Sequence, residues 1–481
     1  MGAFADRFRV RVHADWMTEE EKRRIHEATL DVMARIGVRV DSAQGRKDLR
    51  AAGAVVDDKS RTVRFPADVV EGLLGEAPRR FTLAGRSDEY DLPMDGSHNY
   101  YTTDSCGVSV WEAAEGTRRK SVLEDVRRTA LISDWLPYLS VYSPMVVPFD
   151  VPERSHVVNG VRVSMETTAK HIMSESTSNA EEARAQVRMA AAVVGSLEEL
   201  RERHYLSAVL CTVSPLVLDG NASDAALAFS EGRAPIHIMS MAHAGMSGPA
   251  TLAGDLVVSH AETLAAACMI EAHEPGAPIL YGSILGSMDP RTGAYLGGGP
   301  ETALLCGACA ELARYCRLPV SAGAFGTSAK TPGLQATLEN AMSALSCALV
   351  GGEVVAGIGE PDGSTLLSYE QLLLDHEIAR SVVTMCKGFD VNRETLAEDL
   401  IEKVGVGGTY LAHAHTLKHL REAFLPMLWD SDPFDIWVQK GRKDPMAIAR
   451  EKVEWILKHH EPPRLDGSTS AALGRIVKEF V

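Results

Sequence analysis

The stretch PVSAGAFGTSAKTPGLQATLENAMSALSCALVGGEVVAGIGEPD (319–362) decides the fold. It begins with a short apolar run, Pro319–Ala324, continues through a helical stretch, Gln335–Val350, and ends with a second apolar run, Glu353–Ile358. Short apolar runs bounded by turn residues are typical of buried strands. Because parallel strands need a crossover connection, usually a helix, the stretch predicts one strand–helix–strand unit of a parallel sheet.

The same unit repeats along the chain from about residue 138. The apolar runs are Leu139–Val147, Lys170–Ser174, Tyr205–Val213, Pro235–Met241, Pro278–Leu285, Pro319–Ala324, Glu353–Ile358 and Gly408–His413. Eight such units close into a (β/α)8 TIM barrel. The alternative is an open doubly wound sheet, but no glycine-rich dinucleotide fingerprint follows Val147, so we favour the barrel.

Two further regions flank the predicted barrel. Residues 1–130 predict an N-terminal α+β cap, with a capping box at Thr18–Glu21 and a hairpin formed by Tyr100–Trp111 and Thr117–Lys120. We place the barrel at 131–430 and a C-terminal helical extension at 431–481.

Composition excludes several classes of protein. The net charge is −16, and the acidic balance argues against a nucleic-acid partner. No run of 18 or more apolar residues occurs, and the N-terminus lacks the apolar segment of a signal peptide, so we expect no membrane partner. The eight cysteines are scattered through apolar runs, which predicts a reduced, cytoplasmic protein.

Barrel enzymes place their chemistry at the C-terminal ends of the strands, which selects the candidate residues. Two carboxylates, Glu360 and Asp362, follow the seventh run and are the catalytic candidates. Only 6% of the residues are aromatic, and an aromatic face beside a carboxylate suits a quaternary ammonium. The substrate-binding candidates are Tyr101, His243, Tyr281, Phe325 and His415.

A metal-dependent enzyme is one alternative. His413 and His415 would share a face of the eighth predicted strand, and with a third ligand they could hold zinc. In the main interpretation we assign no metal ligand. A barrel that binds a small ligand without chemistry is a second alternative.

Six segments make the chain resemble the trimethylamine methyltransferase family, in its branch without pyrrolysine. The resemblance runs from near the N-terminus to about residue 430. The segments are IHEATLDVMARIGVRVDS (25–42), YYTTDSCGVSVWEAAEGTRRKSVLEDVRR (100–128), YSPMVVPFDVP (142–152), GTSAKTPGLQATLENAMSALSCALVGGEVV (326–355), SYEQLLLDHEIA (368–379) and GGTYLAHAHTLKHLREAFLPMLWD (407–430).

The resemblance implies a barrel that moves a methyl group from an amine to the Co(I) of a corrinoid (cobalamin). A separate corrinoid-binding protein would carry that cofactor, and we expect none held tightly by this chain. The trimethylamine enzymes use pyrrolysine, whereas this sequence contains only standard residues. A quaternary amine needs no activation to leave, so the resemblance points to a small quaternary amine, betaine-like.

Specific roles follow for the candidate residues. Tyr281 and Phe325 would face the cation, with Glu360 or Asp362 in electrostatic support. His243 or His415 would bind the substrate carboxylate, and Tyr101 would contribute from the predicted cap hairpin. We also expect a homo-oligomer.

Overall fold

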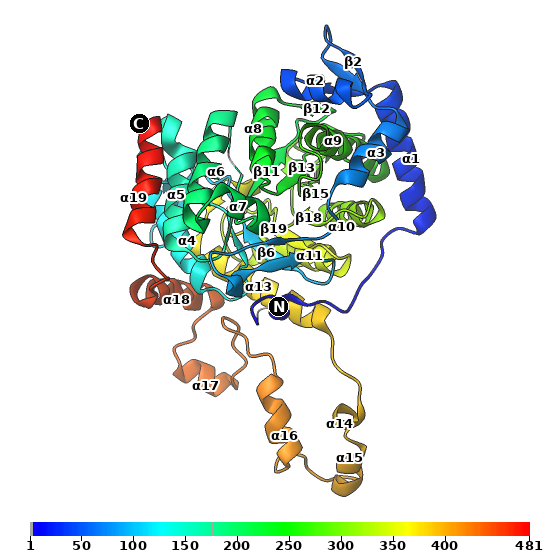
Figure 1. Cartoon of the computed structure of the whole chain (residues 1–481). Helices are drawn as coiled ribbons and strands as arrows, with labels where there is room; N and C mark the ends of the chain where they lie inside the picture. The colour runs from blue at the N-terminus through cyan, green and yellow to red at the C-terminus, as the bar shows by residue number, and fades with distance from the viewer. Residues whose placement is uncertain (1–2, 176) are drawn as a thin grey trace.

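The computed structural model describes residues 3–175 and 177–481 of the chain. At its centre is a closed barrel with the strand order β10-β11-β13-β15-β18-β19-β6-β9, and every pairing in it is parallel. The predicted TIM barrel is therefore confirmed (Figure 1). The strands are β6 (Tyr100–Thr103), β9 (Val141–Tyr142), β10 (His171–Ser174), β11 (Leu206–Cys211), β13 (Ile236–Ser240), β15 (Ile279–Ser283), β18 (Val320–Gly323) and β19 (Val354–Ile358).

One predicted strand is wrong. Residues 408–413 form no strand and are mostly exposed, whereas β6 pairs with β19 and β9 and closes the barrel. All four β6 residues are buried, although two of them are threonines. Because β6 contains two polar threonines, a search for apolar runs did not identify it as a strand. The barrel therefore begins near residue 100, inside the predicted cap of 1–130, and the boundary at residue 130 is corrected.

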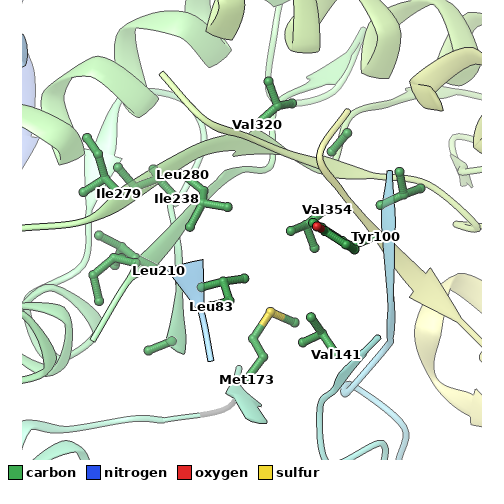
Figure 2. Packing of buried hydrophobic residues seen from close by; sticks show 14 of the residues in the cluster. Leu83, Tyr100, Val141, Met173, Leu210, Ile238, Ile279, Leu280, Val320 and Val354 are labelled. Atoms are coloured by element: carbon green, nitrogen blue, oxygen red, sulfur yellow. The ribbon is translucent and has the colours of Figure 1, made fainter. Parts of the chain in front are cut away.

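Helices connect the strands and cover the barrel. They are α4 (Leu123–Trp135), α5 (His156–Thr167), α6 (Ala180–Val194), α7 (Leu197–Arg203), α8 (Gly220–Glu231), α9 (Leu252–His273), α10 (Pro300–Tyr315), α11 (Leu334–Leu349) and α13 (Tyr369–Lys387). Within the barrel, buried side chains of neighbouring strands pack together, for example Tyr100 beside its register partner Val354 (Figure 2).

Helix α9 is the one helix among the described residues that is long and apolar enough to cross a membrane. Of its most apolar 18-residue window, 78% is buried inside the protein. It lies between the barrel strands and the N-terminal helices, with contacts to both. Burial on two sides accounts for its apolar composition.

The N-terminal region forms the predicted α+β layer. It comprises α1 (Glu19–Arg35), β1 (Val38–Val40), α2 (Ala43–Ala51), β2 (Val55–Asp57), β3 (Thr62–Arg64) and α3 (Ala67–Glu76). The capping box predicted at Thr18 is present, and Gly37 ends α1 with a φ of +85°. Strand β12 (Val217–Leu218), from the loop after β11, extends the sheet in the order β12-β1-β3-β2 and ties the layer to the barrel.

After α13 the chain leaves the body as an arm, which we define as residues 388–444 (Figure 1). The arm carries α14 (Arg393–Leu396), α15 (Glu398–Val404), α16 (Ala414–His419) and α17 (Phe434–Gln439). The chain then returns through α18 (Pro445–His459), which packs on α13 and α4, and α19 (Gly467–Val477), which packs on α6 and α5. The C-terminal region is helical as predicted, but it separates from the barrel earlier than residue 431.

Candidate active site

A cavity of about 360 Å³ opens at the C-terminal ends of the barrel strands. Its walls come from the ends of β6, β10, β11, β13, β18 and β19 and from the loops that follow them. The apolar part of the wall includes three methionines, Met173, Met239 and Met241. This is the end of the fold at which TIM barrels carry their chemistry.

Two carboxyl groups lie side by side in the wall of this cavity. Asp104 directly follows β6 and Glu175 directly follows β10, so strands close together in the barrel bring them side by side. Together with the thiol of Cys106, their polar atoms lie within 4.8 Å of one another. The Ser105 hydroxyl donates to Glu175 Oε2 at 2.5 Å, and the Ser364 hydroxyl donates to Asp104 Oδ2. These donors fix both carboxyl groups in place.

Glu360 lies against the same cluster. Its side chain is only 1% exposed, and Oε2 accepts a hydrogen bond from the Cys106 N–H at 3.2 Å. Its other oxygen, Oε1, has no hydrogen-bond partner among the described residues. The structure thus places Glu360 beside the cavity, next to the carboxyl groups that line it.

Burial and mutual repulsion raise the pKa values of these acids. Burial, reinforced by the charge of Asp104, raises the pKa of Glu175 to about 7. Burial also raises the pKa of Asp104, and it raises that of Glu360 well above its usual range. Among the described lining residues there is no lysine or arginine. The cluster therefore has acidic groups without a fixed cation to balance them.

His243 and Tyr295 form another part of the cavity wall. Their ring centroids lie 4.7 Å apart, and His243 Nε2 has no hydrogen-bond partner among the described residues. Burial lowers the pKa of His243, so its imidazole is neutral at pH 7. The structure places His243 at the mouth, where it is a neutral hydrogen-bonding group.

Three predicted aromatic contacts lie outside the described lining. Tyr281 is 1% exposed and its hydroxyl contacts His260 Nδ1 on α9 at 2.6 Å, away from the cavity. Tyr101 and Phe325 are fully buried and pack edge to face at a centroid distance of 6.2 Å. Parallel barrel strands are buried on both faces, so an apolar run does not reveal which side chains point to the mouth.

Two other predicted residues also lie apart from the cluster. Asp362 sits at the rim, where it pairs with Lys330 at 2.5 Å and Arg118 at 2.7 Å. Burial opposes ionisation there, but hydrogen bonds and charge from those two cations hold the pKa of Asp362 below its usual range. His415 lies on α16 in the arm, where its ring is tilted by 44° against that of His419 with centroids 4.3 Å apart. It is not part of the described cavity lining.

The pair His413 and His415 gains no third ligand. Among the described residues, two groups of His, Cys, Asp or Glu side chains bring their polar atoms close together, and neither group contains these histidines.

The sequence interpretation missed Asp104 and Tyr295. Asp104 follows TT in YYTTDSCG, and only recognition of β6 as a barrel strand would have placed it at the mouth.

A (β/α)8 barrel with an acid-lined cavity at its C-terminal mouth is the class that this fold and site define. The sequence profile described as trimethylamine methyltransferase matches residues 7–479. The trimethylamine methyltransferase of Desulfitobacterium hafniense is 30% identical over 462 residues, covering 96% of this chain and 93% of the relative. The glycine betaine methyltransferase of Desulfitobacterium hafniense is 30% identical over 468 residues and covers 96% of each chain.

A solved structure agrees with the fold. The monomethylamine methyltransferase of Methanosarcina barkeri aligns with a TM-score of 0.50 at 14% identity, covering 94% of this chain and 97% of the other. This chain belongs to the trimethylamine methyltransferase family and is a methyltransferase. The predicted family and enzyme class are confirmed, and both alternatives, the metal-dependent enzyme and the non-catalytic barrel, are set aside.

Proposed function

We propose that the protein transfers a methyl group from a small quaternary amine to the cobalt of a corrinoid carried by a separate protein. The observation that supports this most directly is the pair Asp104 and Glu175, which faces a cavity with no lysine or arginine among its described lining. A quaternary ammonium offers no N–H to a partner, so it is held by charge and by apolar contact. The acid cluster and the methionines supply both.

The mouth of the barrel suits an acceptor that arrives on another protein. Cys106, whose thiol contacts Glu175 at 3.5 Å, is itself exposed, so the cluster is reachable from outside. The corrinoid, when bound, supplies a strongly nucleophilic cobalt. The residues of this chain bind the cation, orient one N-methyl group outward and keep water from the cavity.

The two relatives act on different amines by name, and they are equally similar to this chain at 30% identity. Identity therefore does not choose between a tertiary and a quaternary amine. The absence of pyrrolysine from the sequence favours the quaternary one, because its nitrogen already carries the charge that makes it a leaving group.

The experiment is a methyl-transfer assay with the purified chain, a reduced corrinoid protein and a panel of quaternary amines. Methylation of the cobalt changes the visible absorbance of the corrinoid, and the demethylated amine is measured in parallel. We expect transfer from at least one quaternary amine and loss of transfer in the double variant Asp104→Asn, Glu175→Gln. No transfer from any quaternary amine would overturn the proposal.

We also propose that the chain works as a homo-oligomer whose arms contact neighbouring copies. The arm exposes many large apolar side chains, which is unusual for a segment in contact with water alone. They are Phe389, Val391, Leu396, Ile401, Val406, Leu411, Leu417, Leu420, Leu425 and Phe434. A groove of about 560 Å³ between α1, α9 and α10, lined by Trp16, Leu252 and Leu304 among others, offers an apolar surface for a second copy.

Light scattering coupled to gel filtration tests this proposal on the full chain. We expect an oligomer for the natural sequence and a smaller species for the variant Phe389→Glu, Leu411→Glu, in which both native side chains are 81% exposed. A monomeric natural chain would contradict the proposal.

We further propose a cytoplasmic location. All eight cysteines are free, which supports a reducing, cytoplasmic setting.

A further inference from the structure

The charge of the active-site cavity is unbalanced. Asp104 and Glu175 line it, Glu360 lies directly against them, and no lysine or arginine is present in the lining that the structure describes. The basic groups at the rim, Arg118 and Lys330, are both ion-paired with Asp362. An anionic group on a ligand would meet carboxyl groups inside the cavity without meeting a cation.

His243 does not change this balance. It is the one imidazole in the described lining, and burial keeps it neutral at pH 7. A neutral imidazole forms one hydrogen bond through Nε2, which suits a hydroxyl group as well as any other uncharged polar group. Burial of a carboxylate beside two other acids, without a cation, carries a large desolvation and repulsion penalty.

We propose, on the basis of the proposed function, that the substrate is a quaternary amine with a net positive charge and no carboxylate, and that the Asp104–Glu175 pair balances this charge by releasing a proton when the cation enters. A zwitterionic betaine is therefore disfavoured. Tetramethylammonium and choline are of the favoured class, and the choline hydroxyl would face a group such as His243 Nε2.

The proton balance is simple. Before binding, one carboxyl of the pair carries a proton, because two adjacent carboxylates repel each other. When the cation enters, that O–H bond breaks, its electron pair stays on the carboxylate and the proton passes to water. The net charge inside the cavity stays the same before and after binding.

Several other titratable groups face the pair. They come from the loops after β6 and β19 and from β11, β14 (His243–Ala244) and β17 (Tyr295–Leu296). Burial raises the pKa of Cys211 to about 12 and that of Tyr295 above its usual range, and the charge of Glu175 raises that of Cys106. Burial lowers the pKa of His243 and raises that of Glu360 well above its usual range. Asp104 and Glu175 are the carboxyl groups that line the cavity itself, so the released proton is assigned to them.

Isothermal titration of the full chain with tetramethylammonium, choline and glycine betaine tests the proposal. Titrations in buffers of different ionisation enthalpy give the number of protons released. We expect choline or tetramethylammonium to bind at least tenfold more tightly than glycine betaine. With the pKa of Glu175 at about 7, we expect their affinity to be about tenfold weaker at pH 6 than at pH 8, with close to one proton released at pH 6.

Two variants sharpen the test. Glu175→Gln should flatten the pH dependence and reduce proton release, because one partner of the pair no longer titrates. Glu115→Gln, which changes an exposed carboxyl on the turn between β7 (Ser109–Glu112) and β8 (Thr117–Lys120), should leave both unchanged. A structural defect in Glu175→Gln is detected by its melting temperature, so altered linkage in a folded variant is separable from misfolding.

The outcomes separate this inference from the proposed function. Glycine betaine that binds as tightly as choline, or cation binding without proton release, overturns the inference even if methyl transfer is observed. Choline that binds with proton release but donates no methyl group leaves the inference standing and counts against the function. No binding of any of the three amines, or a stoichiometric divalent ion in the purified protein by elemental analysis, overturns the inference as well.

Discussion

Glu175 should lower the stability of the folded protein at neutral pH, and Glu175→Gln should restore it. The pKa of this carboxyl rises from its usual 4.5 to about 7, chiefly through burial. Below pH 4.5 the carboxyl is protonated in the folded and the unfolded chain, so it has no effect. Between pH 4.5 and 7 the unfolded chain loses the proton first, so stability falls as the pH rises, and above pH 7 the difference is constant.

The size of the effect follows from the same two values. A rise from 4.5 to about 7 corresponds to at most about 3.5 kcal/mol above pH 7, since each pKa unit is worth about 1.4 kcal/mol. For a chain of 481 residues, with an unfolding entropy of about 2 cal/mol/K per residue, this equals a difference in melting temperature of about 3.5 °C. The amide introduced by Glu175→Gln would keep an acceptor for the Ser105 hydroxyl, which donates to Glu175 Oε2 at 2.5 Å in the natural chain.

The assay compares melting temperatures of the natural chain and Glu175→Gln from pH 4.5 to 8.5, without substrate. The difference should be near zero at pH 4.5, grow through pH 7 and then level off, with the variant more stable. Glu115→Gln, on the exposed turn, should give a flat difference. A flat curve for Glu175→Gln, or a variant that is less stable at pH 8, would refute the reasoning that this carboxyl is buried at a cost.

Three further predictions concern residues that the structure reassigns. Tyr281→Phe removes the hydrogen bond to His260 and should lower stability by about 1 kcal/mol, while kcat and KM stay within twofold; a large rise in KM would return Tyr281 to the substrate site. Asp362→Asn removes the carboxylate that pairs with Arg118 and Lys330 and leaves both positive charges unbalanced at the rim. This should lower kcat/KM for a cationic amine severalfold at low salt, with less effect at high salt. A loss of kcat/KM that does not depend on salt would contradict this reasoning. Gly357→Ala should destabilise the barrel by about 2–4 kcal/mol in denaturant unfolding. The reason is that φ of Gly357 is +117° and the added Cβ would lie 2.3 Å from the Ala324 carbonyl oxygen. A loss of stability below about 1 kcal/mol would show that the backbone can shift to make room.

The sequence predicted most of the barrel because its strands follow a simple rule. Seven of the apolar runs contain a barrel strand, since parallel strands buried on both faces are apolar throughout. The rule fails for YYTT at 100–103, where the threonine hydroxyls find partners inside the protein. Thr103 donates to the Ser143 carbonyl oxygen at 2.9 Å, so a polar residue is tolerated in full burial.

The site was harder to predict for the same reason. A residue at the end of a strand reaches the mouth, but a residue within it can point to the barrel axis or to the helices, and an apolar run looks alike in both cases. Tyr281 illustrates the second case, with its hydroxyl on α9. His243 follows the end of β13 and lies at the cavity as predicted, and Glu175, directly after β10, lies there by the same rule.

The proposed proton release also bears on how the product leaves. While the quaternary amine is bound, its positive charge balances the ionised pair of Asp104 and Glu175. Once the methyl group has been transferred, the remaining amine is a neutral tertiary amine, and the two carboxylates face each other without a cation. A proton taken up from water then goes to the tertiary amine, because an aliphatic amine is a stronger base than either carboxylate. The product therefore differs from the substrate by an N–H in place of one N-methyl group, and because water hydrogen-bonds this N–H, the product leaves for solvent more readily than the quaternary substrate does.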